Sequence, residues 1–172
     1  MASKVAKRKT DVMPRTEVKV RGFFRLHIVE DVNGKPEIKG DSGWVENLIT
    51  NVGFANGIVD CLAGISGSSQ ITFAALGTGT APGATDVSLN GELTDVAGAR
   101  MAVTPTNVAS KTAQFAFTLA SGVYTAVHTI QNVGLFQTST TNAGSLYAGN
   151  TYATSQLQSN QAVNGTYQLR FS

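Results

Sequence analysis

The side chains best able to do chemistry in this sequence are two histidines and one cysteine, which lie far apart in the chain. His27 and His128 each fall in a stretch of alternating residues that predicts a strand, and neither has a second histidine or cysteine at the spacing of a metal site. Cys61 lies in an apolar run, which predicts a buried side chain. Because it is the only cysteine, an intramolecular disulfide and a multi-cysteine metal site are excluded.

The acidic residues are confined to the first part of the chain, since none follows Asp95. The C-terminal half therefore cannot supply a carboxylate pair, the acid of a catalytic triad or a cage for a hard cation. Asp86, Glu92 and Asp95 lie in or beside one long loop, but their spacing matches no known calcium-binding loop. The sequence thus predicts no catalytic residues, no metal site and no cofactor, and we do not expect an enzyme.

The stretch from Ile71 to Glu92 begins as a strand that is apolar on both faces and then turns on the sequence GTGT at 77–80. A P-loop needs a lysine followed by Ser or Thr after its second glycine, and a dinucleotide fingerprint needs a third glycine that opens a helix. Neither is present here. The glycines are expected to let the backbone leave the sheet, and not to bind phosphate.

The composition points to a protein whose surface is polar without being charged. Charged residues make up 14% of the chain, against about 25% in ordinary soluble domains. Such a surface suits a subunit that is packed in an assembly. No apolar run is long enough to span a bilayer, and no apolar segment of a secretory signal follows the basic N-terminus, so we expect no membrane contact.

The basic character of the chain belongs to its N-terminus. Residues 1–25 have a net charge of +6, while the whole chain has +2. Residues 1–16 are therefore predicted to form a basic arm, which is either a solvated tail or a segment that contacts neighbouring subunits or nucleic acid. In the second case the contacts would come from its five basic residues, Lys4, Lys7, Arg8, Lys9 and Arg15.

Residues 17–172 are predicted to form a single β-sandwich domain, with a jelly roll as one form of it. Alternating patterns predict seven or eight short strands, and Asn33-Gly34 predicts the tight turn of the first hairpin. The last two strands are expected at 146–152 and 166–171, with a linker rich in Gln and Asn between them. A strand is expected to open at Arg100 and Met101 and to close at Pro105. The fold class is mainly β with an extended N-terminal arm.

One short helix is expected, within the region 45–62. Asn51 is a candidate cap, and the spacing of Phe54, Ile58 and Leu62 places them on one face. The only tryptophan, Trp44, stands just before this region, next to a polar turn. A lone tryptophan in such a position is more often a core residue or an interface anchor than a platform for a ligand.

Three separated blocks of the sequence resemble a family of bacteriophage virion structural proteins. The blocks are ENLITNVG at 46–53, AALGTGTAP at 74–82 continuing through TDVSL at 85–89 to Glu92, and NVGLF at 132–136. In that family a TN.G segment opens a helix, an ALGTGT-type motif follows, and a strand that ends in GLF lies downstream. Asn132 stands where the family often has an acidic residue. The resemblance implies a structural role in the tail, fibre, baseplate or head-associated part of the particle.

The residues and the resemblance together favour a virion protein that assembles with copies of itself and with other virion proteins. We expect a subunit of the capsid shell or its decoration, with a tail, baseplate or fibre subunit as the alternative. Its arm would contact neighbouring subunits or, without base preference, packaged nucleic acid. A second class is a glycan- or receptor-binding module that stacks sugars on Trp44 and on the C-terminal tyrosines, Tyr147, Tyr152 and Tyr167. A third is a single-strand nucleic-acid-binding protein that uses the arm with Phe23 and Phe24.

Overall fold

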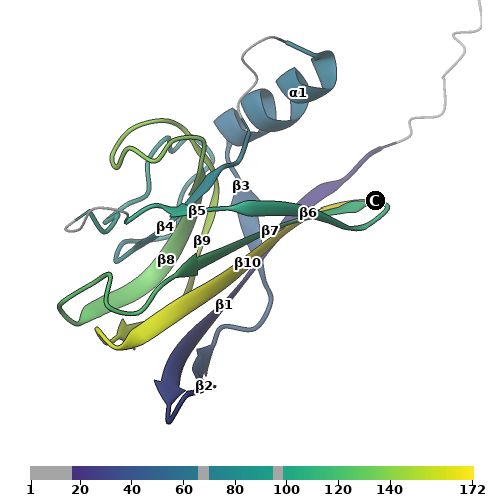
Figure 1. The fold of residues 1–172 in the computed structure, drawn as a ribbon. Helices are drawn as coiled ribbons and strands as arrows, with labels where there is room; N and C mark the ends of the chain where they lie inside the picture. The colour runs from purple at the N-terminus through teal and green to yellow at the C-terminus, as the bar shows by residue number, and fades with distance from the viewer. Residues whose placement is uncertain (1–16, 66–69, 95–98) are drawn as a thin grey trace, which may run out of the picture.

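The computed structural model describes residues 17–65, 70–94 and 99–172 (Figure 1). The five basic residues predicted to make the contacts of the arm lie outside this part of the chain. The described chain is mainly β, with one short helical segment, as predicted. The strands and helices are β1 (Val20–Val32), β2 (Lys35–Asp41), β3 (Val45–Ile49), η1 (Gly53–Val59), α1 (Asp60–Ala63), β4 (Phe73–Gly77), β5 (Met101–Ala102), β6 (Thr104–Ala109), β7 (Thr112–Leu119), β8 (His128–Phe136), β9 (Leu146–Leu157) and β10 (Gln161–Phe171).

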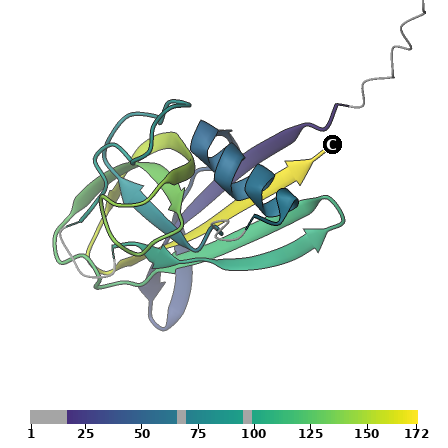
Figure 2. The same ribbon diagram turned by 90° about the horizontal axis from the view of Figure 1, so that it is seen from above.

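The strands form one antiparallel path that curls into an almost closed barrel (Figures 1 and 2). The order is β5-β4-β8-β9-β3-β1-β10-β7-β6, with β2 as a further partner of β1. Strands β5 and β6 are separated only by Val103, so the two ends of the path meet through the chain itself. A sandwich of two separate sheets is not confirmed. Strand β3 connects what would be the two sheets, because its residues Val45 to Asn47 pair with β1 while Leu48 and Ile49 pair with β9.

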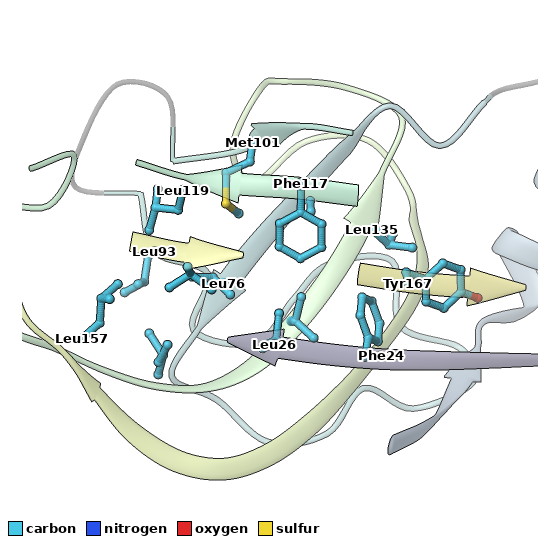
Figure 3. Close-up of a cluster of buried hydrophobic side chains, with 14 of the residues drawn as sticks. Phe24, Leu26, Leu76, Leu93, Met101, Phe117, Leu119, Leu135, Leu157 and Tyr167 are labelled. Carbon is cyan, nitrogen blue, oxygen red and sulfur yellow. The ribbon is translucent and has the colours of Figure 1, made fainter. Parts of the chain in front are cut away.

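The core fills the inside of this curled sheet (Figure 3). On β1 the residues Phe24, Leu26 and Ile28 are buried at every second position, because alternate side chains of a strand point to the same face. Strand β4 is different, since its consecutive residues Ala74 to Leu76 are all fully buried. A strand covered on both faces was predicted here, and the burial of consecutive residues confirms it.

The predicted hairpin turn at Asn33-Gly34 is confirmed. Asn33 and Gly34 have φ angles of 56° and 77°, the left-handed region that such turns require. The N–H of Gly34 also donates to the side chain of Asp31 over 2.7 Å. Strand β2 then pairs back on β1 and ends as an edge strand.

The helix prediction for residues 45–62 is wrong in its first part. Residues 45–49 are β3, and the helical segment starts only after Thr50. The hydroxyl of Thr50 accepts a hydrogen bond from the N–H of Gly53 over 3.0 Å, so Thr50 serves as the cap in place of Asn51. The hydroxyl of Thr50 also donates to the backbone oxygens of Leu146 and Tyr147, which fixes the start of the helix on β9.

Two boundaries late in the chain also differ from the prediction. The linker rich in Gln and Asn is much shorter than predicted, because β9 runs on to Leu157 and β10 begins at Gln161. The two strands follow each other through a tight turn but do not pair, since β9 lies between β8 and β3 while β10 lies between β1 and β7. Pro105 does not close a strand but lies inside β6. It is tolerated there because β6 is the last strand of the path and pairs only with β7.

Candidate assembly surfaces

The three sequence blocks that carry the family resemblance form one connected unit in the structure. Strand β4 of the second block pairs with β8 of the third, from Phe73–Phe136 to Gly77–Asn132. The first block joins them through Asn51, whose N–H donates to the backbone oxygen of Ala84 over 2.8 Å. The blocks therefore describe one local structure, although they lie far apart in the sequence.

The glycines of the GTGT turn allow close packing of the backbone. They were expected to supply unusual backbone angles, but neither Gly77 nor Gly79 has a positive φ. A Cβ on Gly79 would overlap the backbone oxygen of Asn90, and one on Gly77 would overlap the side chain of Asn132. The amide of Asn132 donates to the backbone oxygens of Asn90 (2.8 Å) and Thr80 (3.2 Å), which holds the loop closed. The turn is thus packed against its own chain.

Glu92 belongs to a buried ion pair, and sequence reasoning missed its partner. Arg100 contacts both carboxylate oxygens of Glu92, at 2.6 and 2.9 Å, and the two side chains are 1% and 0% exposed. The same guanidinium donates to the backbone oxygens of Thr138 (2.9 Å) and Ala143 (2.8 Å), and it lies 3.7 Å from the ring centre of Phe136. Each nitrogen of the guanidinium has a partner within the chain, so this cluster joins residues 92, 100 and 138–143.

The other candidates for chemistry are not brought together. His27 lies 3.3 Å from Asp41, while His128 stacks near Tyr124 with 4.7 Å between ring centres. The Asp41 carboxylate accepts two hydrogen bonds from Arg25, which hold its pKa well below the usual range, and a further one comes from the N–H of Gly43. Within the described residues no group of three potential metal ligands occurs.

Cys61 corrects the prediction of a buried thiol, because it is exposed. The apolar run around Cys61 forms the end of the helical segment. Only one side of this segment packs against the barrel. The contact side carries Gly53 and Gly57, where added Cβ atoms would meet the backbone and the ring of Tyr147. Of the larger apolar residues that the spacing of four had selected, only Ile58 lies on this side, next to the two glycines.

The larger apolar residues of this segment point to solvent. Phe54, Val59, Leu62 and Ile65 are 46%, 48%, 82% and 52% exposed. We call these four residues the apolar ridge. Of the three residues predicted to share a face, only Ile58 is half-buried. Four large exposed apolar side chains within one short segment are a candidate interaction site, because monomers rarely expose large apolar patches.

Beside the helix, β1, β10 and the β6–β7 hairpin extend past the barrel (Figure 2). On β10 the residues Tyr167, Leu169 and Phe171 share the inner face, and their burial falls from full to partial along the strand. Here the β6–β7 hairpin forms a groove of about 420 Å³. We call it the hairpin groove; its lining residues are Pro105, Thr106, Asn107, Ser110, Lys111, Thr112, Ala113 and Phe171.

Trp44 lies on the opposite, outer face of the sheet and is 42% exposed. The guanidinium of Arg170 is 5.5 Å from the centre of its ring and 4.3 Å from that of Phe23. The role of Trp44 as an interface anchor stays a prediction. Phe24, the residue after Phe23 on β1, is in contrast 3% exposed and forms part of the core.

The C-terminal tyrosines do not form a stacking surface. Tyr147 and Tyr167 are each 1% exposed, and burial raises the pKa of Tyr152 and of Tyr167 above the usual range.

No helix in the described part of the chain is long and apolar enough to cross a membrane. Comparisons with protein-family models, with curated proteins and with solved structures find no match to this chain.

Proposed function

We propose that this chain is a structural subunit of a bacteriophage virion, which assembles through apolar surfaces with copies of itself and with other virion proteins. The observation that carries the proposal is the apolar ridge, whose most exposed member, Leu62, is 82% exposed. A side chain of this size gains roughly 1.5–3 kcal/mol when it is buried, so the ridge favours association. The low charge of the chain, at 14%, points in the same direction.

The family resemblance gives the virion part of the proposal. Its three blocks build one local structure, held by Asn132 and by the pairing of β4 with β8. A coherent unit of this kind supports the resemblance, because scattered chance matches have no reason to meet in space. We favour the capsid shell or its decoration, since a basic arm on a near-neutral domain suits a shell around nucleic acid. A tail, baseplate or fibre subunit is the alternative, in which the arm would dock on the next ring.

The test is the mass of the purified protein by light scattering, beside a version that starts at Thr16, at low and at high salt. The full-length chain should form large particles or rings that electron microscopy shows to be symmetric. The shorter chain should form smaller assemblies if the arm takes part. A full-length chain that stays monomeric at every salt concentration would count against self-assembly.

A glycan- or receptor-binding module is the second candidate, favoured by the exposed Trp44 beside Phe23 and Arg170. An aromatic side chain of this kind can stack on a sugar ring. The buried positions of Tyr147 and Tyr167 weaken this candidate. A glycan array with the wild type and with Trp44→Ala separates the two functions, because only a glycan-binding module loses a signal in this variant.

A further inference from the structure

We infer that the hairpin groove receives the apolar ridge of a second copy of this chain, so that subunits join helix into groove. The inference rests on the proposed function, because it specifies the contact through which the subunits assemble. It is carried by three observations: the apolar character of the two surfaces, their charges and the orientation of the helix.

The two surfaces match in their apolar character. The ridge belongs to a segment that touches the barrel through Gly53 and Gly57, and its four apolar side chains are exposed. The hairpin groove is shallow and open, and the surface it exposes is mainly apolar, with Ala113 and Phe171 among its lining residues. A smaller hollow of about 270 Å³ adjoins it at Pro105 and extends it to the foot of the helix. Apolar side chains that enter such a groove bury surface on both partners.

The charges of the two surfaces are also complementary. Asp60 is the only charged residue between Asn51 and Ile65. Among the described residues that line the hairpin groove, Lys111 is the only charged one. A helix placed in the groove can therefore pair its single carboxylate with the single ammonium group of the groove. Opposite charges at an interface favour the correct register and disfavour partners of the wrong sign.

The positive charge of Lys111 argues against the N-terminal arm as the occupant of the groove. Residues 1–16 carry five basic residues and one acidic residue, a net charge of +4. Placed in the groove, the arm would bring this positive charge next to Lys111, which is unfavourable.

The ridge of the same molecule cannot fill its own groove. The helix is fixed on β9 by Thr50 and by the two glycines, and Leu62 points to solvent. The partner must be another molecule, and the second copy already carries the matching surface. Because each copy has both a ridge and a groove, the contact closes reciprocally in a dimer or passes from copy to copy around a ring.

The native cysteine allows a direct test, because Cys61 lies on the helix and is exposed. The wild-type chain is mixed with a tagged Cys61→Ser/Ser110→Cys chain under mild oxidation. Ser110 lines the groove, and each chain then has one thiol, so a disulfide within one chain is excluded. We expect a covalent heterodimer on a non-reducing gel. The matched control is a Cys61→Ser/Ile38→Cys chain, whose thiol replaces an exposed residue on β2, away from the groove.

The crosslink should fall about tenfold or more when the wild-type partner carries Leu62→Glu, because burial of one leucine is worth at least a factor of ten in affinity. Asp60→Lys and Lys111→Asp should each lower the mass measured by light scattering, and the double variant should restore it. Equal crosslinking by the Ile38→Cys control, or no restoration in the double variant, would overturn the inference.

The outcomes also separate this contact from the proposed function. If the full-length chain forms rings or shells but the Ser110→Cys chain gives no crosslink, the virion role stands and the helix-into-groove contact is wrong. If the chain neither assembles nor crosslinks at any concentration, self-assembly fails as well. A crosslink that persists after removal of residues 1–16 supports the exclusion of the arm.

Discussion

The cluster around Arg100 and the apolar ridge reverse the usual distribution of residue types, with charge inside and apolar side chains outside. Arg100 and Glu92 are almost completely buried, but each guanidinium and carboxylate contact is made within the chain. The ridge is apolar and has no covering within the described chain. The first region is therefore complete in one molecule, whereas the proposed assembly would cover the second. Substitutions in the two regions should therefore have opposite effects on stability and association.

The largest loss of stability is expected for Arg100→Met. It leaves Glu92 as an uncompensated buried charge and removes the donors to the 138–143 segment, and breaking such a pair costs about 3–5 kcal/mol. Urea denaturation followed by circular dichroism measures this loss. Arg170→Met is the matched control, because Arg170 is exposed and should change stability by less than about 1 kcal/mol. If both variants lost the same free energy of unfolding, the buried ion pair would be no more important for stability than an exposed arginine.

A smaller loss is expected for Gly79→Ala. The added methyl group would overlap the backbone oxygen of Asn90, which cannot move away as a flexible side chain can. Overpacking of this kind costs about 1–3 kcal/mol. Thermal unfolding of the variant checks the loss, beside Gly83→Ala, where the new methyl group meets only ordinary contacts with Asp86. If the two variants unfold at the same temperature, the packed loop does not need its glycine.

A weak dependence of stability on pH is expected from Asp41. Its folded-state pKa lies below the unfolded value of about 3.9, so the carboxylate stabilises the fold above that pH. The contribution is lost as the pH falls from about 4 towards the folded pKa. It is small because the pair with Arg25 is exposed to solvent. Denaturation curves of the wild type and of Asp41→Asn should differ at pH 6 and converge at low pH; a constant difference would contradict this assignment.

The smallest effect on stability is expected at the ridge. Leu62→Glu should change the free energy of unfolding by no more than about 0.5 kcal/mol, because the side chain is 82% exposed. The same variant should lose association, as the crosslinking experiment measures. A loss of stability comparable to that of Gly79→Ala would show that Leu62 packs within its own molecule, and the comparison between the two regions would fail.

Patterns between neighbouring residues predicted much of the fold. Alternation marked the core positions of β1 and β7, and Asn33-Gly34 marked the first turn, because both depend on backbone geometry over a few residues. The prediction failed where a local pattern had two solutions. Residues 45–49 could continue a helix or form a strand, and pairing with β1 and β9 selected the strand. The spacing of Phe54, Ile58 and Leu62 indicated a helical face but not that glycines would make the contact.

The sequence by itself determined that this is a mainly β chain with a basic N-terminus, few charges and no carboxylate after Asp95. These properties follow from composition and from short-range periodicity. Only the tertiary structure decided that Arg100 is buried, because its partners at Glu92, Thr138 and Ala143 come from separate parts of the chain. It also decided that Cys61 and Leu62 face solvent, since the side of a helix that meets the barrel depends on what the barrel presents, here Tyr147. Contacts between distant segments are not encoded in the spacing of neighbours, and these contacts decide which side chains of a segment stay exposed.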